Sequence, residues 1–195
     1  MLGTRIRVVA ASLFIATSIV VASSPAGAST GGTGRTHDHR GYVNPFKPAR
    51  WYEGRIDMGV DYVPRRKHAV VAIGDAKILG SDSHSGWPGG HFIWYKLTDG
   101  DHRGDIIYVA ERLKRLAHRG KRVDAGQRIA TALPSSSGLE IGWANRRGEA
   151  RAAPCYREGM KTHSGREMAR FLKSLGAKTG DRPGRVPDHP RGKRC

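Results

Sequence analysis

Four acidic residues, Asp57, Asp61, Glu111 and Glu140, are the side chains of this sequence best suited to chemistry. Asp57 and Asp61 lie close together and bracket a glycine, which lets the chain bend between them. Grouped carboxylates can bind a hard divalent cation, or can act as general acid and base on a glycan when one of them has a raised pKa. The competing interpretation is that these acids form salt bridges with nearby arginines such as Arg55, Arg65 and Arg66.

Three blocks of sequence resemble a known family in their order and spacing. They are residues 55–62 (RIDMGVDY), residues 120–129 (GKRVDAGQRI) and residues 139–143 (LEIGW). Together they resemble the frame of the lysostaphin-type peptidoglycan metalloendopeptidases, which have a duplicated hybrid motif fold. The resemblance covers residues 55–144 and implies a degenerate domain of this kind in a secreted protein of actinobacterial type.

In that family the first block reads His-x-Gly-x-Asp and the last reads His-x-His, and these residues supply the zinc ligands and a catalytic histidine. Here Asp57 takes the position of the first histidine and Asp61 keeps the aspartate. Glu140 and Gly142 replace the two histidines of the last block. The resemblance therefore implies that Asp57, Asp61 and Glu140 converge on one shallow cleft, with Glu111 at its edge in place of a further histidine.

This set of residues predicts a poor zinc site. A catalytic zinc usually has histidine nitrogen among its three protein ligands, whereas a pocket of carboxylates better suits Ca²⁺, Mg²⁺ or Mn²⁺. We expect no zinc-dependent peptide cleavage, and any metal held by Asp57, Asp61 and Glu140 is expected to be a hard cation. Catalysis on a glycan by Asp61, Glu111 and Glu140 stays open, and so does a pocket without catalytic activity.

Two further residues are candidates for ligand binding beside Asp57. Trp87 lies in a tight loop at residues 85–90, and tryptophan rings stack on sugars and peptides at wet interfaces. The alternative is that Trp87 folds back as an anchor of its own loop. His91 follows two glycines at the start of a β-prone run and could reach a cleft, although loop histidines more often face solvent.

The N-terminus has the features of a secretory signal peptide at residues 1–28. Arg5 and Arg7 precede an apolar stretch, and Ala26-Gly27-Ala28 is a small-residue cleavage site. The apolar stretch is too short for a comfortable membrane span, so no transmembrane segment is expected after cleavage. We therefore expect a secreted protein that resides at the cell wall.

The formal net charge of +17 predicts anionic partners. In an exported protein, peptidoglycan or an anionic wall polymer is the expected partner. Nucleic acid is disfavoured, because the sequence does not interleave aromatic and basic residues as a nucleic-acid platform does. The oligomeric state stays open.

The two cysteines, Cys155 and Cys195, can form a disulfide in an exported chain. Such a bond would tie the C-terminal tail to the domain and contribute about 3–4 kcal/mol in the chain-entropy account. Because Cys195 is the last residue, a free or intermolecular thiol is the alternative.

Short β-prone runs separated by glycine and proline predict an all-β fold at residues 42–150, an antiparallel sheet or sandwich. Gly74 and Asp75 are predicted to form a turn between two of these runs. The turn and the strand after it resemble a hairpin of the family, which implies a hairpin here. Trp143 is expected to face the core. The predicted strands lie at residues 69–73, 76–79, 91–97, 105–111 and 139–144.

One helix is predicted at residues 164–175, within a C-terminal extension at residues 151–176. Ser164 and Glu167 are predicted to form a capping box, and Gly176 to end the helix. Its apolar stripe is expected to pack on the β-domain. The segments at residues 29–41 and 177–195, a polar linker and a basic tail, are predicted to be disordered.

Two functions are consistent with these features. The first is a secreted, wall-associated protein with a peptidase-like domain that lacks the zinc histidines, and that binds peptidoglycan or modulates wall hydrolysis. The alternative is an active peptidoglycan hydrolase, a metallopeptidase or a carboxylate-based glycosidase, that uses Asp57, Asp61, Glu111 and Glu140.

Overall fold

The computed structural model describes residues 41–47 and 51–180. The predicted signal peptide, almost all of the predicted linker and most of the predicted basic tail lie outside the described residues. Cys195 also lies outside them, so its pairing with Cys155 stays a prediction.

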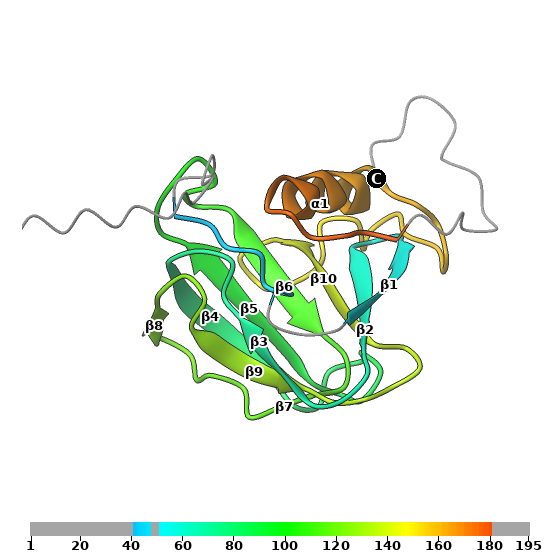
Figure 1. Ribbon diagram of the computed structural model, residues 1–195, viewed down its shortest axis with the longest axis horizontal. Helices are drawn as coiled ribbons and strands as arrows, with labels where there is room; N and C mark the ends of the chain where they lie inside the picture. The colour runs from blue at the N-terminus through cyan, green and yellow to red at the C-terminus, as the bar shows by residue number, and fades with distance from the viewer. Residues whose placement is uncertain (1–40, 48–50, 181–195) are drawn as a thin grey trace, which may run out of the picture. The chain divides into compact units, whose positions relative to one another are not determined.

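Within the described residues the chain forms two antiparallel sheets and one helix (Figure 1). The larger sheet has the strand order β1-β2-β10-β6-β5-β4-β8, and the smaller sheet has the order β3-β9-β7. Strand bounds are β1 Trp51–Ile56, β2 Val60–Pro64, β3 His68–Val71, β4 Ala76–Asp82, β5 Phe92–Leu97, β6 Ile106–Ala110, β7 Leu113–Lys114, β8 Arg122–Val123, β9 Arg128–Ala132 and β10 Leu139–Ala144. The antiparallel β-rich fold with one helix is therefore as predicted.

The turn predicted at Gly74 and Asp75 is present, but the hairpin that the resemblance implies there is wrong. The strand before this turn, β3, pairs with β9, whereas the strand after it, β4, pairs with β5 and β8. Backbone groups beside the turn are bonded to other segments, because Val43 N donates to Ile73 O and Thr98 N donates to Asp75 O. The turn therefore carries the chain from the smaller sheet to the larger one.

The side chains of the neighbouring strands β10 and β6 point alternately into two apolar layers, one on each face of the larger sheet. Ile107 and Ile141 are buried in the main core, which also contains Trp143, as predicted. Side chains on strands alternate in direction, so Tyr108 and Glu140 lie on the opposite face. This second face carries a smaller buried cluster and, beside it, the acidic residues predicted as a site.

Helix α1 runs from His163 to Ser174 and packs on β10, β1 and β2 (Figure 1). Its apolar side chains, including Met168 and Phe171, belong to the main core. The ring of Phe171 stacks on Trp143 with centroids 5.4 Å apart. The helix thus covers the main-core face of β10, the strand that carries Glu140 on its other face.

The predicted capping box is wrong, although the helix starts within one residue of its predicted position. The N-cap is Thr162, whose hydroxyl accepts a hydrogen bond from Gly165 N at 3.0 Å. Glu167 pairs instead with His163, at 2.9 Å. The Thr162 hydroxyl fits the cap better because it also donates to the Asp57 carbonyl, which fixes it in place.

The C-terminal end of α1 is as predicted. Gly176 has a φ of 80°, and its N–H donates to Lys173 O while Ala177 N donates to Leu172 O. This pair of bonds is the Schellman motif that glycine favours. Among the described residues, no helix has the length and apolar character needed to cross a membrane.

Candidate functional site

Strand register places Asp61 and Glu140 side by side. Glu140 in β10 lies directly opposite Asp61 in β2 and, on its other side, opposite Ala110 in β6. Residues that face each other in antiparallel strands project to the same side of the sheet. The carboxyl groups of Asp61 and Glu140 are therefore neighbours, and Glu111 follows directly where β6 ends.

Asp57 reaches the same place from the turn between β1 and β2. Its N–H donates to Gly59 O, which closes the turn, and its carbonyl accepts bonds from the N–H and the hydroxyl of Thr162 at 3.0 and 2.8 Å. Gly165 in the first turn of α1 approaches so closely that a Cβ there would collide with the Asp57 carbonyl. The helix N-terminus thus fixes the backbone of Asp57.

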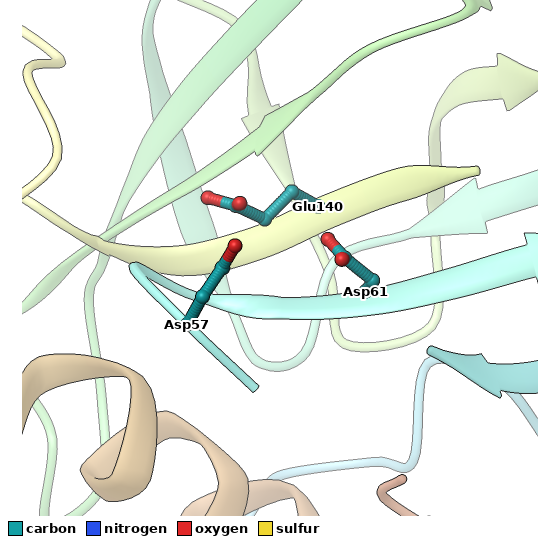
Figure 2. A group of neighbouring side chains, drawn as sticks. All are labelled: Asp57, Asp61 and Glu140. Carbon is teal, nitrogen blue, oxygen red and sulfur yellow. The ribbon is translucent and has the colours of Figure 1, made fainter. Parts of the chain in front are cut away.

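Figure 2 shows the three carboxyl groups of Asp57, Asp61 and Glu140 pointing toward one another. One oxygen from each lies within 4.8 Å of the others. The relative exposures of the three residues are 0%, 8% and 3%. The structure therefore brings together the three residues that the sequence placed in one cleft, in a setting where carboxylate charge is poorly solvated.

Arg55 supplies the positive charge of this cluster. Its Nε lies 2.7 Å from Asp57 Oδ2 and 3.2 Å from Asp61 Oδ2. Its Nη2 lies 2.5 Å from Glu158 Oε1. The salt-bridge interpretation of these acids is thus correct for Asp57 and Asp61, and a single guanidinium serves both of them.

Asp57 has donors suited to an ionised carboxylate. Met58 N donates to its Oδ1 at 2.6 Å, and the hydroxyl of Tyr156 donates to its Oδ2 at 2.8 Å, beside Arg55. Tyr156 is held in turn by Gly159 N, which donates to its hydroxyl oxygen at 3.1 Å. A backbone N–H, a hydroxyl group and a guanidinium therefore hold the Asp57 carboxyl group in place.

Asp61 and Glu140 favour the protonated form. Burial, followed by the charge of Asp57, raises the pKa of Asp61 to about 8, against the opposing effect of Arg55. Burial raises the pKa of Glu140 well above its ordinary value, and the charges of Asp57 and Asp61 act in the same direction. At neutral pH the cluster therefore holds protons as well as carboxylates.

Tyr108 fills the space beside Glu140. Its hydroxyl donates a hydrogen bond to Glu140 Oε1, and it lies opposite Gly142 in the strand register. A Cβ at Gly142 would lie 2.6 Å from the Tyr108 ring. The position at which the resemblance expects a second histidine is therefore occupied by the tyrosine ring of the neighbouring strand.

A cleft of about 1000 Å³ opens over the acid cluster. Asp61, Glu111 and Glu140 line it, whereas Asp57 lies beneath them and is fully buried. The other side chains around it come from β1, β2, the turn between these strands and three loops, and include Tyr52, Glu53, Arg55, Trp87, Ser137, Tyr156 and Glu158.

Trp87 combines the two roles considered from the sequence. It is half-buried, its ring stacks on Tyr108 with centroids 5.4 Å apart, and it lines the cleft. The side chain of His91 is not part of the described cleft lining, and its Nδ1 lies 2.7 Å from Gly89 O. A role of His91 in ligand binding stays a prediction without support from this geometry.

Tyr156 and Glu158 were not predicted as site residues. They belong to an irregular segment after β10, and in the sequence neither has a periodic pattern or a motif that would assign it to the cleft. Their approach to Asp57 and Arg55 depends on tertiary packing, and only the structure reveals it.

The residues of the cluster do not fit zinc. The set offers three carboxyl groups without a histidine nitrogen, and the Arg55 guanidinium already lies between two of them. Oxygen atoms within 4.8 Å of one another match the span of a calcium or magnesium coordination sphere, so the donor type fits a hard cation. Arg55 and the two protonated acids oppose such an ion. To bind it, the guanidinium would have to move away, and Asp61 and Glu140 would have to lose their protons.

Comparison with solved structures finds several similar chains, and one of them is lysostaphin. A solution NMR structure of lysostaphin is similar to this chain with a TM-score of 0.49 and 19% sequence identity, over 77% of this chain and 62% of that chain. This chain therefore spans less than two thirds of the length of that protein. No protein-family model and no curated protein matches the chain. At this level of likeness, activity and ligand have to be argued from the site itself.

Proposed function

We propose that this protein is a secreted, cell-wall-associated protein whose β-domain binds peptidoglycan without cleaving its peptides through zinc. In this role it anchors at the wall or modulates the hydrolysis of peptidoglycan by enzymes. The acid cluster at the base of the cleft is structural in this proposal, and the cleft above it is the contact surface.

The position of Arg55 is the observation that carries the proposal. A guanidinium that is paired with Asp57 and Asp61 compensates the cluster from within the chain. A metallopeptidase needs an ion that polarises a carbonyl and lowers the pKa of a bound water. Here the cation is a side chain that does neither, and Tyr108 fills the space beside Gly142.

The charge distribution supports two different contacts with the wall. The chain has a formal net charge of +17, which favours attachment to anionic wall polymers. The cleft combines hydroxyl groups, carboxyl groups and the aromatic side chains of Trp87, Tyr52 and Tyr156. Aromatic faces beside hydrogen-bonding groups are suited to sugar rings and short peptides.

Retention on purified peptidoglycan sacculi tests the proposal. The mature protein should co-sediment with sacculi at low salt, and high salt should weaken retention because it screens the basic surface. Trp87→Ala should weaken the retention that remains at high salt, whereas His84→Ala, just before this loop, should not. An absence of co-sedimentation at low salt would overturn the proposal.

Carboxylate-based glycan hydrolysis is the second candidate, because Asp61 lines the cleft with a pKa of about 8 and can donate a proton at neutral pH. The oxygens of the cluster, however, lie within 4.8 Å, closer than the about 5–5.5 Å or about 6.5–9.5 Å separations of glycosidase carboxyl pairs. Release of new reducing ends from sacculi that is lost in Asp61→Asn would favour this candidate over simple binding.

A further inference from the structure

Acidic residues dominate the cleft of this basic protein. Its lining has five carboxyl side chains and one basic side chain. The basic one, Arg55, is already paired with Asp57, Asp61 and Glu158. The acids of the lining are Glu53, Asp61, Glu111, Glu140 and Glu158.

Glu111 interacts with Ser137, but the surrounding protein leaves one of its two carboxyl oxygens without a partner. It is 8% exposed, and its Oε2 is buried without a hydrogen-bond partner among the described residues. A buried carboxyl oxygen without a partner loses solvation and gains nothing in return, so such atoms in native proteins call for an explanation. Because Glu111 lines the cleft, a ligand there can supply the missing donor.

The backbone holds Glu111 in this position against its own preference. Glu111 has a φ of 71° and Arg112 a φ of 33°, both in the left-handed region that side chains other than glycine seldom adopt. Two bonds to the Trp87 loop fix this conformation, from Glu111 N to His91 O and from Arg112 N to Pro88 O, each 3.1 Å long. The same two bonds tie the loop that carries Trp87 to the loop that carries Glu111.

The donor that Glu111 lacks is best supplied by a cation on a short chain. A carboxylate bonds more strongly to an ammonium group than to a neutral donor, and an aromatic face beside it adds attraction for the same charge. Glu53 and Trp87 line the same cleft and contribute further negative charge and such a face. An anionic or purely apolar ligand would face like charges or leave the carboxyl groups unpaired.

We infer that the cleft recognises a primary ammonium group carried on a peptide or amino-sugar ligand, with Glu111 as its acceptor and Trp87 as its aromatic wall. The inference rests on the proposed function in one respect, because it specifies the chemical group of the cell wall that the cleft binds. The basic surface then attaches the protein to anionic polymer, and the acidic cleft selects chains that bear amines.

The test uses the mature protein and two small probes with the same side-chain carbons, Nα-acetyl-lysine methylamide, which carries the ammonium group, and Nα-acetyl-norleucine methylamide, which lacks it. Titration is followed by NMR through the indole N–H of Trp87. The lysine probe should give saturable shifts, and the norleucine probe should bind at least about tenfold more weakly, because it lacks the charge. Equal shifts from both probes, or none from either, would overturn the inference.

Variants then assign the acceptor. Glu111→Gln keeps the size of the side chain and should weaken binding of the lysine probe about tenfold, whereas Glu149→Gln, outside the cleft lining, should leave it unchanged. Binding that is unaffected by Glu111→Gln would remove Glu111 from the site. If Glu111→Gln does not fold, the comparison of the two probes on the unaltered protein still decides the inference.

Retention on sacculi separates this inference from the proposed function. If the protein is retained on sacculi but the lysine probe does not bind, the inference fails while the proposed function stands. If the probe binds but the protein is not retained on sacculi at any salt concentration, the proposed function fails while the ammonium site stands.

Discussion

The Nε atom of Arg55 lies 2.7 Å from Oδ2 of Asp57, an aspartate with no exposed surface. The guanidinium side chain itself remains 39% exposed and also reaches Asp61. A single, partly solvated cation therefore compensates a buried group of acids, so removal of Arg55 should affect both stability and ion binding.

Arg55→Met should lower the free energy of unfolding by about 2 kcal/mol. This value lies between the small contribution of an exposed ion pair, about 0–1 kcal/mol, and the loss of about 3–5 kcal/mol when a buried pair loses one partner. Chemical denaturation at neutral pH measures it. Arg66→Met, at an exposed arginine, is the control and should have little effect. Equal stability of the two variants would show that Arg55 does not compensate the cluster.

The same Arg55→Met protein should gain affinity for calcium. With the guanidinium removed, Asp57, Asp61 and Glu140 keep oxygens within 4.8 Å, a spacing that suits a hard cation. An ion that binds only the folded state raises the melting temperature. Millimolar Ca²⁺ should therefore stabilise Arg55→Met more than the unaltered protein, as measured by differential scanning fluorimetry. A larger calcium shift in the unaltered protein would argue that Arg55 does not exclude the ion.

The stability of the protein should fall as pH rises from about 4 to about 8. The pKa of Asp61 is about 8 in the folded protein and 3.8 ordinarily, so between these values the folded state retains a proton that the unfolded state has released. The stabilisation is complete below the ordinary pKa and is lost as pH rises through the folded one. Glu140 acts in the same direction, because burial also raises its pKa.

Asp61→Asn should flatten this pH dependence, because asparagine has no proton to release. The comparison is of unfolding free energies at pH 5 and pH 8 by urea denaturation. Asp124→Asn, at an exposed aspartate outside the cleft lining, should keep the slope of the unaltered protein. A slope that is the same in both variants would mean that Asp61 ionises in the folded protein as it does in the unfolded chain.

The sequence predicted the acids of the site better than their partners. Asp61 and Glu140 lie in two recognisable motif blocks, and strand alternation with antiparallel register is enough to bring them together. The sequence offers Arg55 as a partner because it lies close to Asp57, although it offers Arg65 and Arg66 as well. Tyr156 and Glu158 were not, because an irregular segment has no periodicity from which its path could be inferred.

The errors in the fold have a similar cause. The Gly74-Asp75 pair has the composition of a hairpin turn, but hydrogen bonds from distant segments decide which strands pair. Ser164 and Glu167 have the spacing of a capping box, but the Asp57 carbonyl selects Thr162 as the cap. Local patterns predicted that a turn and a helix start would occur, and tertiary contacts decided how each was made.

Thr162→Ala should lower the free energy of unfolding by about 1–2 kcal/mol. The variant loses the helix cap to Gly165 N, and it also loses the hydroxyl bond to the Asp57 carbonyl. Chemical denaturation measures the loss. The matched control is Ser164→Ala, because the Ser164 hydroxyl is buried without a hydrogen-bond partner among the described residues. If Ser164→Ala were the more damaging change, the predicted capping box would be correct and the observed cap wrong.

Gly142→Ala should destabilise the protein through its contact with Tyr108. A Cβ at this position would lie 2.6 Å from the tyrosine ring, which itself is fully buried and bonded to Glu140, so the ring cannot move without breaking that bond. Overpacking of this kind costs about 1–3 kcal/mol. Gly86→Ala is the control, because a Cβ at Gly86 would meet nothing within 4 Å.

A double-mutant cycle with Tyr108→Ala assigns the clash. If the ring is what a side chain at position 142 meets, Gly142→Ala should cost less in the Tyr108→Ala protein than alone, with a coupling energy of about 1 kcal/mol or more. Additive effects would place the strain in the backbone of β10 instead. Coupling would explain why the histidine that the resemblance expects at this position is missing here, because the tyrosine that supports Glu140 already occupies its space.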